Sequence, residues 1–206
     1  MRTKQQVVAE FRSSEILAAA RKVFSVNGFR DTTVDEVAAA AGLSKATVYT
    51  YFPSKQDIYL AALSEGVREM VEQIELAMQM APGGIRCKIQ AYLQTRLEFL
   101  HENREFFAVY HAEFGNLIHP AWLNQEFRCL YRRQFDRLKD LLEEAVERGE
   151  LAADISVETL AAAIYESARG LMLRRNLGWT EASIDEQVST LMRILWDGVE
   201  VRNVDR

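Results

Sequence analysis

Apolar residues recur at spacings of three and four along almost the whole chain, and no segment shows the sustained alternation of a half-buried strand. A repeat near 3.6 residues predicts amphipathic helices that bury one face. The sequence therefore predicts an all-α protein of about nine helices. We place them at residues 4–27, 33–40, 44–51, 54–80, 86–102, 105–115, 120–148, 157–177 and 184–201.

Several predicted helix ends carry capping signals. Thr3–Gln6, Thr33–Glu36 and Ser183–Glu186 have the spacing of a capping box, in which two residues exchange side-chain and backbone hydrogen bonds. Asn27-Gly28 is typical of a helix stop, because glycine readily adopts the left-handed conformation that ends helices. The longest interruption is Pro82-Gly83-Gly84, which we expect to end the fourth helix.

The segment from Thr33 to Phe52 is predicted to form a helix-turn-helix, because a tight turn at Gly42 joins two short capped helices. Its inward apolar positions would pack on Phe24 of the first helix; they are Val34, Val37, Ala38, Leu43, Val48 and Phe52. The outward positions offer hydroxyls, one cation and one aromatic ring, which suit phosphates and base edges; they are Ser44, Lys45, Thr47, Tyr49 and Thr50. A purely structural helix-turn-helix inside a helical bundle is the alternative.

From Phe24 to Lys55 the chain reads F-x-x-x-G-F-x-x-T-T-V-x-x-V-A-x-x-A-G-L-S-x-x-T-V-Y-x-Y-F-x-S-K. This string closely resembles the N-terminal domain of the TetR/AcrR family of transcriptional regulators. The resemblance covers about a quarter of the chain, and its Tyr-x-Tyr-Phe-x-x-Lys portion is the most specific part. It implies a three-helix DNA-binding domain over residues 1–54, followed by a larger helical domain for effector binding and dimerisation over residues 55–206.

The resemblance also implies roles for individual residues. Matching family positions contact DNA phosphates at Thr33, Thr47, Tyr49 and Lys55, and they face bases or nearby backbone at Ser44, Lys45, Ala46 and Thr50. The chain departs from the family pattern twice. Ala46 stands where many members have glycine, and its methyl group could touch a thymine methyl or simply fill space. Thr50 stands where histidine is frequent, so a base preference attached to that histidine does not transfer.

The distribution of charge fits a DNA-binding head. The net charge of the chain is −5, which alone argues against a polyanion partner. Residues 1–55, however, hold 8 basic and 5 acidic residues, a net +3, whereas the remainder holds 17 basic and 25 acidic residues, a net −8. We therefore expect a basic head that meets double-stranded DNA and an acidic body that stays away from it.

Sequence features place the protein in the cytoplasm. No apolar run approaches the roughly 20 residues that span a bilayer, and the first residues lack the apolar core of a secretory signal, so we expect no membrane association. The two cysteines, Cys87 and Cys129, stand alone without a C-x-x-C spacing. In a cytosolic protein they are expected to be reduced core residues rather than a disulfide or a metal site.

A helix-turn-helix usually reads DNA as one of a pair, with half-sites about 34–36 Å apart or a multiple of that. The last two predicted helices are the candidates for pairing the chains, since one has an apolar stripe and the other has small residues that allow close approach. We predict a homodimer interface at Ala161, Ala168, Val188, Leu191 and Leu195. Periodicity alone fits equally well with a stripe that covers only the chain's own core; the resemblance favours the dimer.

The middle of the chain mixes aromatic residues with isolated polar groups. Ligand cavities are typically apolar with a few placed polar groups, although an aromatic stripe is more often core than cavity. The resemblance implies an effector pocket between these helices. We predict that it is lined by Arg96, Phe107, Tyr110, His111, Phe114, Tyr131 and Phe135.

Catalytic and metal-binding signatures are lacking in the sequence. The chain has 3 histidines, and it has no Gly-rich phosphate loop and no nucleophile motif, so we predict neither an enzyme nor a cofactor. His111 and Glu113 lie about 200° apart on a helix and cannot easily share a metal ion. We predict a repressor that binds a palindromic operator as a dimer and is released by a small, largely apolar effector. A DNA-binding regulator controlled by a protein partner is the alternative.

Overall fold

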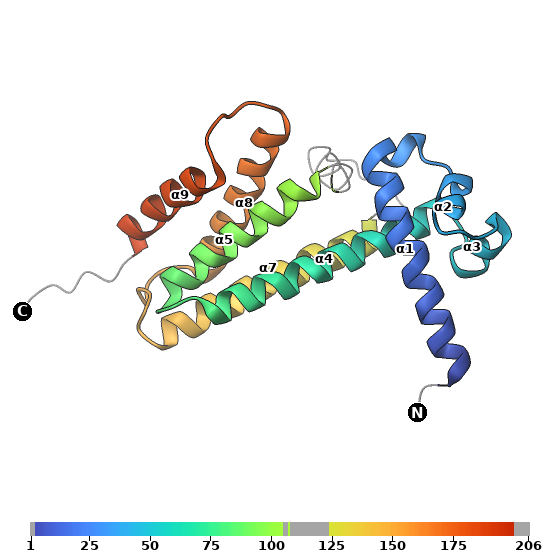
Figure 1. Cartoon of the computed structure of the whole chain (residues 1–206). Coiled ribbons are helices and arrows are strands. Elements are labelled where there is room, and N and C mark those ends of the chain that lie inside the picture. The colour runs from blue at the N-terminus through green and yellow to red at the C-terminus, as the bar shows by residue number, and fades with distance from the viewer. Residues whose placement is uncertain (1–2, 105–106, 108–123, 200–206) are drawn as a thin grey trace, which may run out of the picture. The chain divides into compact units, whose positions relative to one another are not determined.

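The computed structural model describes residues 3–104, 107 and 124–199, and within these residues the secondary structure is entirely helical. This confirms the predicted all-α fold with an N-terminal helix-turn-helix. In chain order the helices are α1 (Lys4–Asp31), α2 (Val34–Ala40), α3 (Lys45–Tyr51), α4 (Lys55–Met80), α5 (Ile85–Glu102), α7 (Asn124–Glu147), α8 (Val157–Asn176) and α9 (Ile184–Val199) (Figure 1). Most of the predicted helix at 105–115 lies outside the described residues.

The predicted end of the first helix needs a correction. Gly28 does leave the helical conformation, with φ 74° and ψ 172°, which side chains other than glycine rarely tolerate. The chain then resumes a further helical turn up to Asp31 and ends at Thr32. Gly28 is therefore a kink within α1 rather than its end, and the ammonium of Lys55 donates to the carbonyls of Phe29 and Arg30 in the turn that follows.

Local capping agrees with the sequence pattern elsewhere. The hydroxyls of Thr3 and Thr33 accept hydrogen bonds from the backbone N–H three residues later, and both capping boxes are complete. At Ser183 the backbone N–H of Glu186 donates to the hydroxyl at 3.1 Å, and the Glu186 carboxylate accepts from the Ser183 N–H at 2.8 Å. These predicted capping boxes are confirmed.

The chain divides into two compact units. One comprises residues 1–68 and 103–127, and the other comprises residues 69–102 and 128–206; helix α4 contributes its first half to the first unit and its second half to the other. The core of the first unit is built from one face each of α1, α2, α3 and the start of α4. Its buried side chains include Ile16, Ala20, Phe24, Val37, Val48, Phe52, Ile58, Tyr59 and Leu63.

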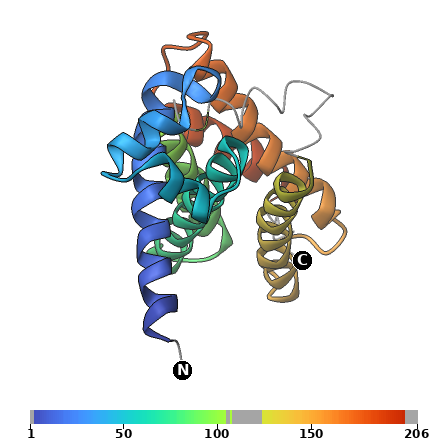
Figure 2. The same cartoon turned by 90° about the vertical axis from the view of Figure 1, so that its right-hand side faces the viewer.

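In the second unit α5 packs against α8 and α9 (Figures 1 and 2). The buried side chains here are mainly aliphatic and include Ile89, Leu93, Leu97, Leu138, Leu142, Leu160, Ile164, Val188 and Met192. Four aromatic side chains of the described residues are buried with them, namely Tyr92, Phe99, Tyr165 and Trp196. None of the helices described is both long and apolar enough to cross a membrane.

Candidate nucleic-acid interface

Helices α2 and α3 meet at a turn that depends on Gly42. This residue has φ 66°, a left-handed conformation that carries little strain only in glycine. The N–H groups of Gly42 and Leu43 donate to the carbonyls of Ala39 and Ala38 at 3.1 and 2.9 Å, which satisfies carbonyls at the end of α2. The chain is thereby turned sharply into Ser44, the N-cap of α3.

The inward face of the motif is buried as the pattern indicates. Five of the six predicted positions are buried, namely Val34, Val37, Ala38, Val48 and Phe52, while Leu43 is half-buried. Phe24 of α1, the predicted partner, is almost fully buried as well. The burial of these apolar side chains fixes which face of α3 remains outside.

The outward face of α3 is exposed. Ser44, Lys45, Ala46, Tyr49 and Thr50 are exposed and Thr47 is half-buried. Its hydroxyls have local partners: the Ser44 hydroxyl lies 2.8 Å from that of Thr47, and the Thr50 hydroxyl donates to the Ala46 carbonyl at 3.0 Å. Hydroxyl groups held in this way can still accept or donate a further hydrogen bond.

Lys45 carries an intramolecular ion pair. Its ammonium lies 2.6 Å from the carboxylate of Asp35 on α2, and both side chains are largely exposed. The hydrogen bond from this ammonium to Asp35, together with the attraction between the opposite charges, raises the pKa of Lys45. The cation on the recognition helix is therefore shared with a carboxylate of the preceding helix.

Thr33 is engaged in the cap of α2. Its backbone N–H and its hydroxyl both donate to the carboxylate of Glu36, at 2.7 and 2.9 Å. These two hydrogen bonds, and to a smaller degree the charge of Lys55, lower the pKa of Glu36. A phosphate that reached Thr33 would meet this carboxylate.

Lys55 has a different environment from the one predicted. Its ammonium donates to the carbonyl oxygens of Phe29, Arg30 and Thr32 at 2.8, 3.0 and 2.8 Å. It also lies 4.7 Å from the centre of the Phe29 ring. The side chain therefore points into the junction between α1 and α2.

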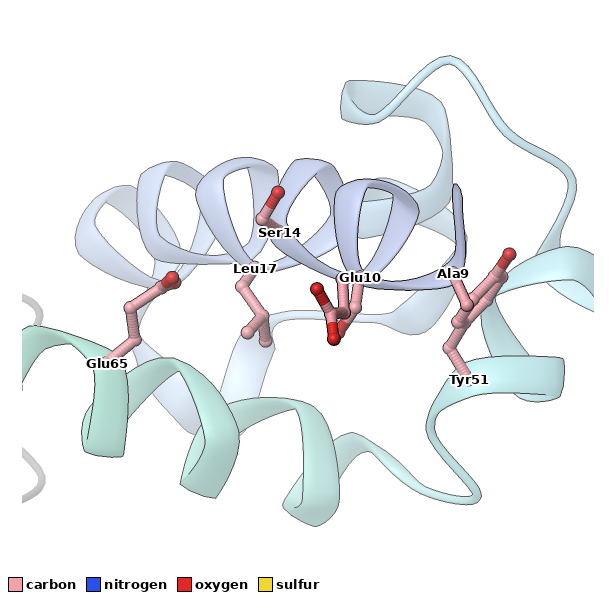
Figure 3. A pocket seen from close by; sticks show the side chains of 7 residues that line it. Ala9, Glu10, Ser14, Leu17, Tyr51 and Glu65 are labelled. Carbon is pink, nitrogen blue, oxygen red and sulfur yellow. The ribbon is translucent and has the colours of Figure 1, made fainter. Parts of the chain in front are cut away.

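A separate groove is lined mainly by α1. It has a volume of about 390 Å³ and is lined by α1, by Tyr51 at the end of α3 and by Glu65 of α4. Figure 3 shows Glu10 and Leu17 directed from α1 toward the helix that carries Glu65. Two carboxylates at this groove disfavour a phosphate backbone, so the candidate DNA surface is the outward face of α3.

Comparison with known proteins identifies the kind of domain that carries this surface. Residues 16–62 match the family model described as "Bacterial regulatory proteins, tetR family". Residues 16–62 therefore form a TetR-family helix-turn-helix domain. The matched residues include α2, α3 and the first part of α4, which are the elements that carry the candidate DNA surface.

Relatives extend the TetR-family likeness over most of the chain. An uncharacterised HTH-type transcriptional regulator of Bacillus subtilis, YfiR, is 28% identical over 154 residues, which is 73% of each chain. The HTH-type transcriptional repressor KstR2 of Rhodococcus jostii is 25% identical over 196 residues, or 91% of each chain. Both relatives are regulators rather than enzymes, which agrees with the absence of catalytic motifs.

A solved structure shows the same fold. The transcriptional regulator FadR of Bacillus subtilis, determined in complex with stearoyl-CoA, superposes with a TM-score of 0.77 at 19% sequence identity. The superposition covers 90% of this chain and 98% of FadR. The helical fold of this chain is therefore that of FadR over most of its length.

Of the predicted effector residues, Arg96 has the most informative surroundings. Its side chain is only 3% exposed, and it donates to the amide oxygen of Gln134 at 2.7 Å. The guanidinium also lies 4.4 Å from the centre of the Tyr165 ring, which in turn contacts Phe135 edge-on at 6.3 Å. A polar cluster therefore joins α5, α7 and α8 inside the second unit.

Tyr92, one helical turn before Arg96, belongs to this cluster. Burial raises the pKa of Tyr92 to about 12, although the nearby Arg96 charge acts in the opposite direction. Its hydroxyl is buried without a hydrogen-bond partner at acceptable geometry among the described residues. Neither Tyr92 nor Gln134 was predicted as a site residue; the i, i+4 spacing of Tyr92 and Arg96 was the available signal.

The structure describes only two of the other predicted effector side chains. Phe107 is fully buried in the first unit and Phe135 is half-buried in the second. Tyr110, His111 and Phe114 lie outside the described residues, as does the side chain of Tyr131. The structure therefore brings Arg96 and Phe135 into one cluster.

The predicted dimer residues divide into two groups. Ala161, Ala168 and Val188 are covered by their own chain, with at most 1% of their surface exposed. Leu191 and Leu195 are half-buried, and Ile194, which was not predicted, is 67% exposed. Exposed apolar surface on α9 therefore lies at its C-terminal half.

Proposed function

We propose that this chain is a ligand-responsive repressor that binds a palindromic operator as a homodimer and releases it when a small, largely apolar effector binds. One observation carries the proposal: a TetR-family helix-turn-helix presents an exposed face of hydroxyls, one cation and one aromatic ring on α3. The relative KstR2, a transcriptional repressor, supports the proposal.

The proposed DNA contacts fall into two kinds. Tyr49, Thr47 and Thr33 would hold phosphates and set the register of the head on the duplex. The exposed residues Ser44, Lys45, Ala46 and Thr50 would reach base edges or the adjacent backbone in the major groove. Lys45 has to leave Asp35 before it can bind a phosphate or a guanine, so its contact exchanges one charged partner for another.

The proposed dimer uses α8 and α9. A groove of about 350 Å³ lies between the start of α8 and the C-terminal half of α9, with Ile155, Leu160, Ile194 and Leu195 in its lining. A second copy would cover the exposed Ile194 and the half-buried Leu191 and Leu195. Ala161, Ala168 and Val188 would support this surface from beneath, since their side chains face their own core.

The proposed effector site lies in the second unit around the cluster of Tyr92, Arg96, Gln134 and Tyr165. Buried polar groups are costly unless they gain a partner, so a polar cluster within an aliphatic core suits recognition of one polar end of an apolar ligand. FadR, bound to stearoyl-CoA, is an example of this fold with an acyl ligand. Phe107, Tyr110, His111, Phe114, Tyr131 and Phe135 remain proposed lining residues.

Helix α4 is the proposed link between effector and operator. It is continuous from Lys55 to Met80, and it contributes to both compact units. An effector would act by binding one conformer more tightly than the other, in which α4 holds the two heads at a different spacing. A ligand that binds tightly without changing operator affinity would contradict this mechanism.

The first test is selection of binding sites from random duplex DNA with the full chain, followed by titration of the selected site at several salt concentrations. We expect a pseudo-palindrome, a steep salt dependence, and affinity reduced at least tenfold by Tyr49→Ala. Failure to enrich any sequence would contradict the proposed operator.

The second test screens small apolar molecules by thermal shift and then measures operator affinity in the presence of each binder. We expect that at least one molecule that binds the protein also weakens its affinity for the operator. An operator-binding protein for which no such binder exists would instead be controlled by a protein partner.

A further inference from the structure

Helix α5 places a cation inside the second unit. Arg96 is 3% exposed, and a guanidinium keeps its charge at physiological pH. One of its N–H groups donates to the amide oxygen of Gln134 at 2.7 Å, and the guanidinium lies over the Tyr165 ring, 4.4 Å from the ring centre. Both of these groups are uncharged. They hold the guanidinium in one orientation without removing its charge.

The Tyr92 hydroxyl is a buried donor beside this cation. Tyr92 lies one helical turn before Arg96 on the same face of α5 and is 6% exposed. Its hydroxyl has no hydrogen-bond partner at acceptable geometry among the described residues, and burial raises the pKa of Tyr92 to about 12, so the hydroxyl keeps its proton at neutral pH. Arginine has donors and no acceptor, so Arg96 cannot accept a hydrogen bond from this hydroxyl. The Tyr92 hydroxyl therefore needs an acceptor from elsewhere.

An oxyanion is the group that suits both side chains. A carboxylate accepts hydrogen bonds at both of its oxygens, and its charge is opposite to that of Arg96. A guanidinium has five N–H donors, so the bond from Arg96 to Gln134 is compatible with a second acceptor. A neutral carbonyl could accept the same hydrogen bonds, but it would gain less from the buried positive charge.

The amount of buried charge favours a carboxylate over a phosphate. Among the buried polar side chains that the structure describes, Arg96 is the charged one; the others are Thr32, Gln134 and Gln187. A phosphate monoester carries a charge of about −1.5 to −2 at neutral pH, whereas a carboxylate carries a single negative charge. One buried cation therefore matches a carboxylate and leaves part of the charge of a phosphate monoester uncompensated.

The helices that carry this cluster otherwise bury hydrocarbon. Leu93 and Leu97 directly follow Tyr92 and Arg96 on α5, and Leu138 lies one turn after Gln134 on α7. These three leucine side chains are at most 2% exposed. A ligand whose carboxylate reaches Arg96 therefore enters a core that favours an apolar remainder.

We propose that the effector is an amphiphilic carboxylic acid, bound as its anion by the Arg96 guanidinium and the Tyr92 hydroxyl, with its hydrocarbon part in the aliphatic core of the second unit. This inference rests on the proposed function and specifies the class of effector. It separates a free acid from an acyl thioester such as the stearoyl-CoA bound by FadR, because a thioester has no carboxylate at the end of its acyl chain.

The test measures the binding of matched ligands to the full chain by isothermal titration calorimetry. The probes are decanoate, dodecanoate, palmitate and phenylbutyrate below their micellar concentrations, together with the primary amide of each acid and with dodecanoyl-CoA. We expect at least one acid to bind, and to bind at least about tenfold more tightly than its amide, because the amide lacks the charge. Dodecanoyl-CoA should bind no more tightly than dodecanamide.

Three variants assign the carboxylate contact. Arg96→Met removes the charge, Tyr92→Phe removes only the hydroxyl, and Arg174→Met is the control, because it removes a cation from an exposed position on α8. We expect the affinity for the acid to fall at least about tenfold in Arg96→Met and about three- to tenfold in Tyr92→Phe, with smaller effects on the amide. Arg174→Met should bind both ligands as the wild type does. Tyr92→Phe decides the test if Arg96→Met fails to fold, since the lost hydroxyl has no described partner.

Several results would overturn the proposal. They are that no acid binds, that an amide or dodecanoyl-CoA binds as tightly as the matching acid, or that Arg96→Met or Tyr92→Phe binds the acid as the wild type does. Operator titrations distinguish this failure from failure of the proposed function. If an acid binds through Arg96 and Tyr92 without weakening operator affinity, the carboxylate site stands and the ligand-responsive repressor is wrong. If a neutral molecule releases the operator and no acid binds, the proposed function stands and the carboxylate site is wrong.

Discussion

The backbone N–H of Ile85, the first residue of α5, donates a 2.5 Å hydrogen bond to the carboxylate of Glu150, 65 residues further along the chain. Arg148 donates to the other carboxylate oxygen of Glu150 at 2.7 Å. The helix after the Pro82-Gly83-Gly84 break is thus capped by an acidic side chain from the segment that follows α7. The cap ties the start of α5 to the α7–α8 connection within one unit.

Glu150→Gln tests the charge of this cap. The hydrogen bonds from Arg148 and from the Ile85 N–H lower the pKa of Glu150, so the ionised form is the stabilising one. Glutamine keeps an acceptor for Ile85 but removes the charge, and we expect a loss of about 1 kcal/mol in the free energy of unfolding, or roughly 2–4 °C in melting temperature.

The pH dependence of this loss has a definite sign. A lowered carboxyl pKa stabilises the fold fully above the pKa of the unfolded chain, near 4.5, and this stabilisation disappears as the pH falls through the folded-state value. Thermal unfolding of wild type and Glu150→Gln at pH 7 and at decreasing pH should therefore converge at acid pH. A difference that is constant with pH would contradict the assigned role.

Gly84→Ala tests the space beside the same cap. A Cβ atom at Gly84 would overlap the Glu150 carboxylate, so the carboxylate would have to leave the α5 N-terminus. We expect Gly84→Ala to lower the melting temperature about as much as Glu150→Gln, and the double variant to lose little more than either alone. Gly170→Ala is the control, because nothing lies within 4 Å of its Cβ position and alanine favours a helix; it should be neutral or stabilising. Additive losses in the double variant would contradict the shared mechanism.

Asp35→Asn tests the ion pair on the DNA surface. Asp35 holds Lys45 and also places a negative charge beside the recognition helix, so its removal should raise affinity for operator and unrelated duplexes alike, by roughly three- to tenfold at low salt. The gain should shrink as salt increases. Asp31→Asn, which removes a charge of the same sign from an exposed position of α1, is the control. Fluorescence-anisotropy titrations measure the DNA affinity of both variants. Equal effects of the two variants would show that affinity depends only on net charge.

Sequence alone predicted features that depend on near neighbours. The capping box at Thr33, the turn at Gly42 and the buried face of the helix-turn-helix follow from capping spacing, a glycine signal and helical periodicity, and each is found in the structure. Long-range partners were not predictable in the same way. Lys55 meets carbonyls 23 to 26 residues away, and its environment is decided by how α1 and α4 pack.

Local patterns were also insufficient for the predicted interface and effector residues, because they do not identify the partner of a buried side chain. An apolar stripe on α8 and α9 indicates burial, but it does not distinguish burial in the chain's own core from burial against a second copy; Val188 is buried in its own chain while Ile194 is exposed. Arg96 was identifiable as a lone cation in an apolar stretch. Its partner Gln134 lies 38 residues away on α7, beyond any local pattern.

Tyr92→Phe tests whether the polar cluster of the second unit is built for stability. The Tyr92 hydroxyl is buried with no hydrogen-bond partner at acceptable geometry among the described residues, and burial raises the pKa of Tyr92 to about 12. Removing a buried hydroxyl that lacks a partner should leave the melting temperature unchanged or raise it by a few degrees, since up to about 1 kcal/mol of desolvation is recovered.

Gln134→Leu is the contrasting variant: it removes the acceptor of the Arg96 guanidinium and should lower the melting temperature by roughly 5 °C. Differential scanning calorimetry of both variants measures the effect. A loss of stability in Tyr92→Phe comparable to that in Gln134→Leu would show that the hydroxyl has a stabilising partner and would remove it from the groups available to an effector.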